Sequence, residues 1–229
     1  MGNRKEGAGM KTILFSTPMV QAILAGRKTQ TRRIVKPQPK HEVVKIWTDT
    51  QDPIQYHFQS PWAGTPCDGI HVSGTVAKPR YERGDILWVR ETWGISNFDV
   101  EDYSVNIVYK ADEKEVGYEI VFPDEKFTKL YNSMTAMSPD WRPSIHMPKE
   151  AARIFLKVTG VRVERLQEIT EEDARAEGCK PLLNGGGFVV ISARGKFHVL
   201  WDSINLKRWY GWDTSPWVWV IEFERTEEK

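Results

Sequence analysis

Short runs of alternating apolar and polar residues predict that strands dominate this chain. Residues 153–165 (RIFLKVTGVRVER) alternate over most of their length and predict a long strand with a bulge or bend at Gly160. Residues 217–224 (WVWVIEFE) place four large apolar side chains on one face of another strand. Further extended segments are expected at residues 11–16, 27–35, 43–47, 55–58, 85–93, 105–110, 118–122 and 141–148.

Three short helices are expected between these strands. Residues 18–25 follow two residues that can cap a helix, carry a proline in the first turn and end before Gly26. Residues 170–177 begin with an approximate capping box and end before a glycine. Residues 196–204 repeat apolar side chains at helical spacing. The chain therefore lacks the regular strand–helix alternation of a doubly wound sheet.

This order of elements predicts an α+β, β-rich fold, built as a mixed barrel with short flanking helices and inserted hairpins. Residues 1–9 are polar and contain glycine, so they are expected to form a flexible leader. Residues 10–225 are expected to form a single domain with insertions at about 40–80 and 95–150. Residues 182–188 (LLNGGGF) are expected to form a flexible loop.

Composition narrows the class of protein. The chain has 229 residues, of which 40% are hydrophobic and 28% charged, as in an ordinary globular protein. It has neither a run of 18 apolar residues nor the apolar stretch of a secretory signal, so the cytoplasm is the expected location. The net charge of +1 requires that any nucleic-acid site be sought in local basic clusters. Ten Trp residues indicate a thick core, base-stacking platforms, or both.

The segment 24–33 (LAGRKTQTRR) combines four basic residues with two threonines. On a straight strand Lys28 and Thr31 point to opposite sides, so they meet only if the chain kinks after Gly26. One interpretation is a solvated basic strand that binds phosphate or nothing. The other is that the clustered positive charge favours the neutral form of Lys28, which then acts as a base for a neighbouring Thr hydroxyl.

Three motifs together resemble one known family. They are ILAGRKTQTRR at 23–33, Gly84–Asp85 followed by the strand ILWVRETW, and the helix TEEDARAEG at 170–178. In this combination the chain resembles the ASCH family, which has a PUA-like barrel and is linked to RNA or modified-nucleoside chemistry. The resemblance runs from about residue 11 to residue 224, and LWVRETW with WRPSIHMP looks like the longer form often found in phage and prophage genomes.

The resemblance also implies a catalytic set. Some small members of the family are amidohydrolases that remove the acyl group from N4-acetylcytidine, and their Lys, Thr and Glu match Lys28, Thr31 and Glu177 by position. Lys28 would accept the proton of Thr31, whose oxygen attacks the acyl carbon. Glu177 would protonate the departing exocyclic amine. The chain is much longer than those compact hydrolases, so its insertions can reshape the pocket and change the substrate.

Basic and aromatic residues near these motifs are candidates for binding substrate or nucleic acid. They are Arg27, Arg32, Arg33, Arg90, Glu91, Trp93, Trp141, Arg142 and His146. For Glu91 the simpler interpretation is an ion pair, and for His146 a packed loop with backbone hydrogen bonds. Neither metal-ligand spacing nor a phosphate-binding glycine motif is present, so no metal and no cofactor are expected.

Three functions are consistent with these residues. An amidohydrolase of N4-acylcytidine-type nucleosides requires Lys28, Thr31 and Glu177 to converge on a small pocket. A non-catalytic module that binds RNA or modified DNA requires a long basic groove and predicts a steep salt dependence. A metal-independent ribonuclease predicts cleavage of unmodified RNA. The expected partner is RNA, DNA or a modified nucleoside, and not a membrane; no oligomeric state is predicted.

Overall fold

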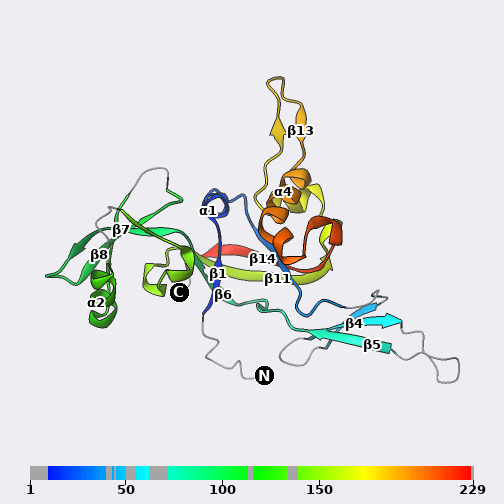
Figure 1. Cartoon of the computed structure of the whole chain (residues 1–229), viewed down its shortest axis with the longest axis horizontal. Coiled ribbons are helices and arrows are strands. Elements are labelled where there is room, and N and C mark those ends of the chain that lie inside the picture. Colours follow the sequence, from blue (N-terminus) through cyan, green and yellow to red (C-terminus); the bar gives the residue numbers. More distant parts are fainter. Residues whose placement is uncertain are drawn as a thin grey trace. The chain divides into compact units, whose positions relative to one another are not determined.

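Strands outnumber helices, as the hydrophobic pattern predicts. The computed structural model describes residues 10–39, 43, 45–49, 55–61, 72–112, 116–133 and 139–227. In these residues the strands form four sheets, each an open row of neighbouring strands (Figure 1). The α+β, β-rich class is confirmed, whereas none of the four described sheets closes into a barrel, and the barrel stays a prediction. The predicted leader 1–9 lies outside the described residues.

The chain divides into two compact units, and each is built from separate segments of sequence. The first contains the described residues of the ranges 1–28, 84–157 and 224–229, and the second those of 29–83 and 158–223. The long strands β11 (Phe155–Arg165) and β14 (Trp217–Thr226) contribute residues to both units. The predicted single domain stays a prediction.

The first unit contains a small sheet around β6 (Ile86–Arg90). Strand β1 (Lys11–Leu14) pairs with β6 in parallel, and the beginning of β11 pairs with β6 in the antiparallel direction. Helix α1 (Thr17–Leu24) follows β1 and ends before Gly26, whose φ of +68° is left-handed. The helix predicted at 18–25 is therefore confirmed within one residue at each end.

The same unit contains a four-stranded antiparallel sheet. Its strands lie in the order β10 (Asp140–Arg142), β7 (Trp93–Asp99), β8 (Ser104–Tyr109) and β9 (Tyr118–Val121). Helix α2 (Asp124–Asn132) is absent from the sequence predictions; it packs Phe127 into the core of this sheet. The largest buried members of that core are Trp93, Ile107, Tyr109, Phe122 and Met147.

The segment after β10 forms helical turns where an extended chain is predicted. Two short 3-10 turns follow β10, η1 (Ser144–His146) and η2 (Lys149–Ala151). Pro143 and Pro148 occupy the N-cap positions of these turns, where a fixed φ is compatible with the start of a helical turn. The prediction of an extended segment at 141–148 is therefore wrong beyond β10.

In the second unit, β11, β14 and β2 (Gln30–Ile34) are neighbours in that order. Strand β2 pairs antiparallel with β14, and the backbone N–H of Phe223 donates to the Thr29 carbonyl oxygen at 2.8 Å. The strands predicted at 27–35 and 217–224 are confirmed as this pair.

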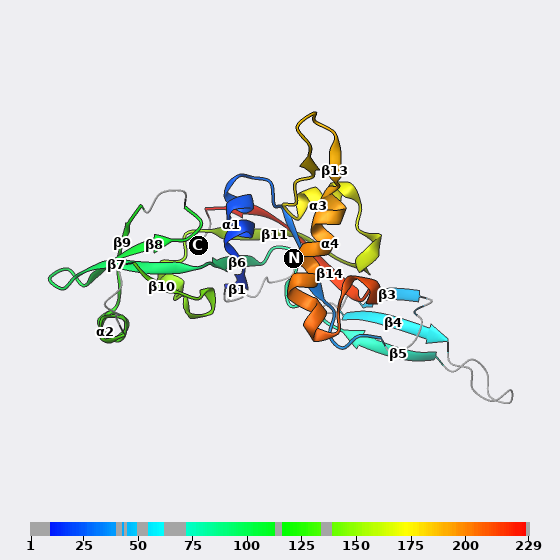
Figure 2. The ribbon, with the colours of Figure 1, turned by 45° about the horizontal axis from the view of Figure 1, so that its top comes forward.

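A second antiparallel sheet of this unit contains three strands. These are β3 (Lys45–Asp49), β4 (Gln55–Pro61) and β5 (Val72–Ala77), which lie side by side in Figure 2. Tyr56 lies edge-on to Trp219 with ring centroids 4.7 Å apart, and Phe58 lies edge-on to Trp217 at 5.5 Å. These aromatic pairs pack β4 against β14.

The helices of the second unit surround a smaller core. The 3-10 turn η3 (Leu166–Glu168) precedes α3 (Glu171–Ala176), and α4 (Ala193–Asn205) is followed by the turns η4 (Leu206–Arg208) and η5 (Trp212–Thr214). Ser192 caps α4 by accepting from the Gly195 N–H, so α4 begins three residues earlier than predicted. Phe197 and Trp201 of this helix are buried, whereas Ile204 is 45% exposed.

A hairpin replaces the loop expected at 182–188. Strands β12 (Leu182–Leu183) and β13 (Val189–Ile191) pair antiparallel, and Asn184 accepts hydrogen bonds from the backbone of Gly186 and Phe188 in the turn. The three glycines therefore lie in a tight turn between a leucine arm, β12, and a β-branched arm, β13.

None of the helices in the described part of the chain is both long enough and apolar enough to cross a membrane.

Candidate active site

Strand β2 carries four polar side chains on alternating sides. Arg33 and Thr31 share one side, where Arg33 Nη1 donates to Thr31 Oγ1 at 2.9 Å. Gln30 and Arg32 share the other side, where both contact Asp173 of α3. The strand therefore divides the charges of its basic run between two sides, as the period of a strand requires.

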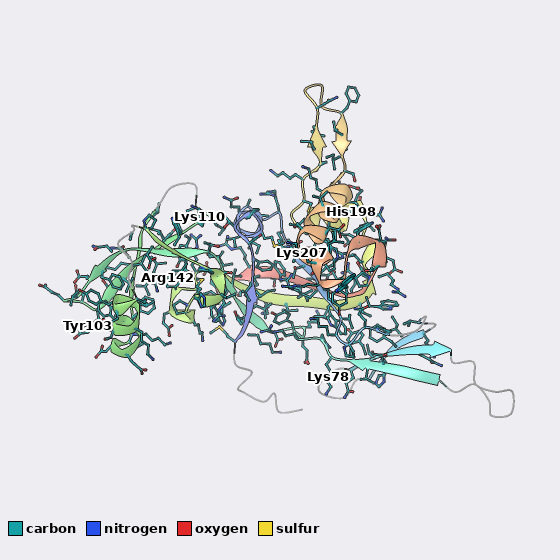
Figure 3. All side chains as sticks on the ribbon, in the orientation of Figure 1. Lys78, Tyr103, Lys110, Arg142, His198 and Lys207 are labelled. Atoms are coloured by element: carbon teal, nitrogen blue, oxygen red, sulfur yellow. The ribbon has the colours of Figure 1, made fainter. Side chains whose placement is uncertain are left out.

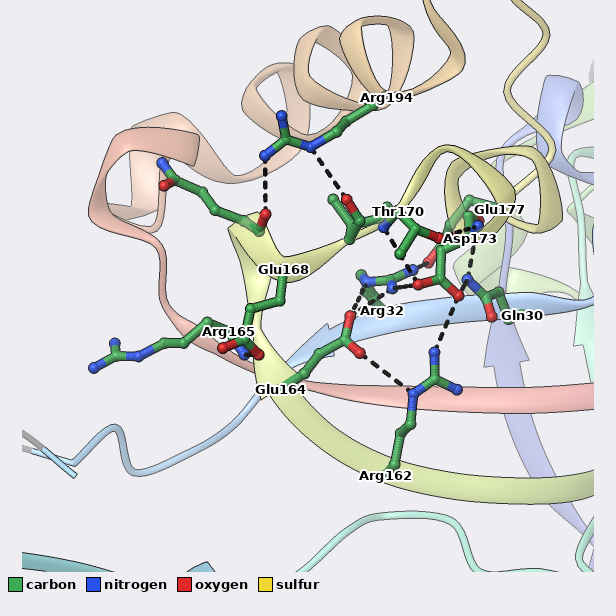
Figure 4. Close-up of polar contacts among 12 residues, drawn as sticks. Gln30, Arg32, Arg162, Glu164, Arg165, Glu168, Thr170, Asp173, Glu177 and Arg194 are labelled. Carbon is green, nitrogen blue, oxygen red and sulfur yellow. Dashed lines mark hydrogen bonds and ion pairs between the residues drawn. The ribbon is translucent and has the colours of Figure 1, made fainter. Parts of the chain in front are cut away.

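Arg32 lies at the centre of a network of carboxylates (Figure 4). Its guanidinium is fully buried and contacts Glu164, Asp173 and Glu177. Its Nη1 lies 3.2 Å from Glu177 Oε1, and its Nη2 lies 3.2 Å from Asp173 Oδ2. Arg162 of β11 pairs with two of the same groups, at 3.3 Å from Glu164 Oε2 and 3.1 Å from Asp173 Oδ1. The two arginines thus join β2, β11 and α3.

Asp173 and Arg162 of this network are held in their charged forms. Partial burial by itself raises the pKa of Asp173, but the Gln30 hydrogen bond and the Arg32 charge outweigh it and place the pKa below its ordinary value of 3.8. Burial by itself lowers the pKa of Arg162, but the charges of Glu164, Asp173 and Glu222 outweigh it and raise this pKa. Asp173 and Arg162 therefore form an ion pair at neutral pH.

Thr31 is buried, with 1% of its surface exposed. Its hydroxyl oxygen accepts the hydrogen bond from Arg33, which leaves the hydroxyl its own hydrogen to donate. Burial lowers the pKa of Arg33, against the opposing charge of Glu177. A cationic donor on the Thr31 oxygen stabilises negative charge there, which is what a nucleophilic hydroxyl needs.

Glu177 is the C-cap residue of α3 and is 4% exposed. The end of α3 is tied to the beginning of β2, because the Thr29 N–H donates to the Ala176 carbonyl oxygen at 2.8 Å. Gly178, at φ +93°, then turns the chain away, as the sequence predicts. Thr31 and Glu177 are therefore buried side chains of the same unit.

Lys28 is also buried, with 2% exposed. It follows the turn at Gly26, and its backbone N–H donates to the Ala22 carbonyl oxygen at 3.1 Å. Its Nζ lies 5.5 Å from the ring centroid of Phe15. Gly26, at a left-handed φ of +68°, turns the chain at the position where a kink is required for Lys28 to meet Thr31. Lys28 is the last residue of its segment in the first unit, whereas Thr31 and Glu177 belong to the second.

Glu91 forms a separate ion pair inside the first unit. Arg153 holds it with two hydrogen bonds, Nε to Oε1 at 2.9 Å and Nη2 to Oε2 at 3.0 Å, and also pairs with Asp112 at 2.8 Å. Burial raises the pKa of Glu91, and the hydrogen bonds and charge of Arg153 oppose this rise. The Arg153 guanidinium lies 3.9 Å from the ring centroid of Tyr109. This geometry matches the ion-pair interpretation of Glu91.

The other predicted binding residues take varied positions. Trp93 is fully buried in the core of its sheet and presents no open face to a base. Arg90 donates to the Ile145 carbonyl oxygen at 3.1 Å, and Arg142 pairs with Asp140 at 2.6 Å. His146 is exposed in η1.

Trp141 and Arg27 are half-buried. The Nζ of Lys110 lies 4.5 Å from the Trp141 ring centroid. Figure 3 labels Lys110, which directly follows β8, and Arg142 of β10. Arg27 lies in the turn after Gly26, where its N–H donates to the Ala22 carbonyl oxygen at 2.8 Å. Trp141 therefore already has one face near a cation.

Sequence reasoning did not single out the residues that complete the two networks. The strand pattern places Arg162 and Glu164 only within a long strand, and no sequence motif links Arg153 or Asp112 with Glu91. One signal was present: Arg162 and Glu164 are two residues apart on β11, so they share one face of the strand. Their partners come from distant segments, and the pattern of one strand does not identify them.

Among the described residues, no three His, Cys, Asp or Glu side chains are grouped so as to hold a metal ion. The chain matches no protein-family model, and neither a curated protein nor a solved structure matches it.

Proposed function

We propose that this chain is an amidohydrolase of the ASCH type, with a PUA-like fold, that acts on N4-acylcytidine or a related modified nucleoside. The observation that supports the proposal is that Thr31 and Glu177 are buried in one unit, at 1% and 4% exposed, and that each is contacted by an arginine of β2. Lys28 is assigned to the set by its position in the GRKTxT element, and it is likewise buried, with 2% exposed. Buried ionisable groups beside a hydroxyl nucleophile are typical of catalytic sites.

The proposed reaction is an acyl transfer in two steps. Lys28, as the neutral amine, accepts the proton of Thr31, and the Thr31 oxygen forms a bond to the acyl carbon. The carbon–nitrogen bond then breaks, and Glu177 protonates the departing exocyclic amine to release cytidine. Water next attacks the carbonyl carbon of the acyl ester on Thr31 and gives its proton to the Glu177 carboxylate, while Lys28 returns its proton to the departing Thr31 oxygen. The products are cytidine and a carboxylic acid.

Arg33 and Arg32 have distinct supporting roles in this proposal. The Arg33 hydrogen bond at 2.9 Å stabilises charge on the Thr31 oxygen as it attacks. Arg32 fixes the Glu177 carboxyl group through its contact at 3.2 Å. Both arginines are positioning residues, because they act through Thr31 and Glu177.

A purely binding module has less support. Binding of a nucleic-acid backbone requires cations that face solvent along a groove. Arg32 is fully buried and surrounded by three carboxylates, so its charge is neutralised inside the unit. The basic run that suggested nucleic-acid binding therefore contributes fewer surface cations than its sequence indicates.

The test is release of cytidine from N4-acetylcytidine, measured by chromatography, for four proteins. We expect wild type to release cytidine and Thr31→Val to lose about a thousandfold or more in kcat/KM. Thr31→Ser keeps a hydroxyl and is expected to retain part of the activity. Thr29→Val is the matched control, because Thr29 is exposed two residues earlier in the same segment.

A Thr31→Val protein with wild-type turnover would exclude Thr31 as the nucleophile. If wild type releases no cytidine from any N4-acyl derivative, the hydrolase proposal is wrong. Degradation of unmodified RNA would then indicate the ribonuclease, and salt-dependent binding without cleavage would indicate the binding module.

A further inference from the structure

The hairpin of β12 and β13 exposes more apolar surface than any function described above requires. All residues from 182 to 191 are exposed. The large apolar side chains among them are Leu182 at 44%, Leu183 at 51%, Phe188 at 74%, Val189 at 61%, Val190 at 60% and Ile191 at 37%. The hairpin extends away from α4 in both views (Figures 1 and 2). Contiguous apolar surface of this kind marks an interaction site.

The chemistry of the hairpin excludes two kinds of partner. Residues 181–193 contain no Lys or Arg, so the hairpin offers no charge to a phosphate backbone. The hairpin is a sheet of only two strands, and its outer edges carry backbone groups that face away from the ladder. Open sheet edges are not tolerated in the hydrocarbon core of a bilayer, so insertion into lipid is disfavoured as well.

The sequence of β13 is complementary to itself. In an antiparallel two-fold contact centred on Val190, Val189 of one copy meets Ile191 of the other. Pairs of β-branched side chains across strands are stabilising. Strands at sheet edges normally carry a charge or a proline that prevents such pairing, and residues 182–191 contain neither.

We propose that this hairpin docks on the same hairpin of a second copy of the chain. The contact is isologous: β13 of one copy pairs antiparallel with β13 of the other at their open edges, with Val190 at the two-fold axis. Ten residues from each copy are fewer than the 20–30 of a standard interface, so the dimer is expected to form in a concentration-dependent manner. The proposal is independent of the proposed function, because no candidate catalytic residue lies in the hairpin.

The test is sedimentation velocity of the full chain over a range of concentrations. Val190 has no opposite residue on β12, because the pairs Leu182–Ile191 and Leu183–Val189 pass it by. Val190→Lys therefore leaves the ladder intact while placing a charge at the centre of the contact. The matched control is Val199→Lys, because Val199 is equally exposed, at 66%, on α4.

We expect wild type and Val199→Lys to change from one chain to two as concentration rises, and Val190→Lys to associate about tenfold or more weakly. Equal thermal unfolding of the three proteins shows that folding is unaffected. A wild type that stays a single chain overturns the proposal, as does equal association of Val190→Lys. Association beyond two copies also overturns it, because an isologous contact closes.

Discussion

Two arginines that pair with buried carboxylates, one in each unit, are surrounded very differently. Arg153 of the first unit pairs with Glu91 and Asp112 and lies against the ring of Tyr109. Arg32 of the second unit contacts three carboxylates, two of which also pair with Arg162. In the first arrangement one arginine pairs with two carboxylates. In the second, two arginines share carboxylates.

The difference shows that burial of a charge is not by itself a sign of function. Glu91 directly follows β6 and Arg153 lies two residues before β11 begins, so their ion pair links the ends of two neighbouring strands. The Arg32 network instead reaches Glu177, and the adjacent Arg33 reaches Thr31. A buried charge suggests function when its partners include residues that have a chemical role of their own.

The largest effect is expected from removing either arginine. Arg153→Met and Arg32→Met each leave buried carboxylates without their cation, which costs about 3–5 kcal/mol of unfolding free energy. Urea denaturation measures this loss. Lys129→Met is the control, because the Lys129–Glu125 pair is exposed, and we expect no measurable change there.

The same two variants separate structure from function. Under conditions where both remain folded, Arg153→Met should keep the wild-type kcat, whereas Arg32→Met should lower it. Equal kcat for both variants would show that the Arg32 network is structural in the same sense as the Arg153 pair.

The pH dependence of stability should differ in sign between the two networks. The pKa of Asp173 is lowered in the folded chain, so its contribution is present above its ordinary value of 3.8 and is lost as pH falls through the folded value. The pKa of Glu91 is raised, so its contribution is complete below 4.5 and is lost as pH rises through the folded value.

Two neutral variants measure these contributions. As pH rises from about 3 to 6, the stability of wild type relative to Asp173→Asn should increase, and that relative to Glu91→Gln should decrease. Denaturant unfolding at several pH values gives both differences. Parallel changes for the two variants would contradict the opposite pKa directions.

The smallest effect is expected at the cap of α3. Thr170 accepts from the Asp173 N–H at 3.1 Å, and Asp173 reaches back to the Thr170 N–H. Thr170→Ala should cost about 1 kcal/mol. Ser16→Ala is the control, because Ser16 occupies the N-cap of α1 but makes no side-chain cap hydrogen bond. A loss at Ser16 as large as that at Thr170 would show that the capping bond is not the cause.

Local chemistry made much of the fold predictable. The alternation of β11 and β14, the proline of α1 and the capping box of α3 act over a few residues, and each gave an element close to its observed bounds. The loop predicted at 182–188 is wrong, because the three glycines obscure the short apolar arms of a hairpin. The segment 141–148 is predicted as extended, but Pro143 precedes a helical turn.

The candidate site was predictable only in part, for a related reason. The residues of β2 and α3 share local motifs, so Thr31 and Glu177 were identified from sequence. Arg32 was expected to bind a partner, but it pairs with Glu164, 132 residues away. Such partners depend on which strands become neighbours, and one sequence does not encode that as a local pattern.

The pairing of β2 with β14 has a consequence for how the chain is made. Residue 31 leaves the ribosome long before Ile221, the residue opposite it in the ladder. At synthesis rates of about 5–20 residues per second, β2 must wait roughly ten seconds or more for its neighbour. During that interval Arg32 and Thr31 lack the neighbour strand β14, so the edge of β2 stays open to other strands until translation reaches β14.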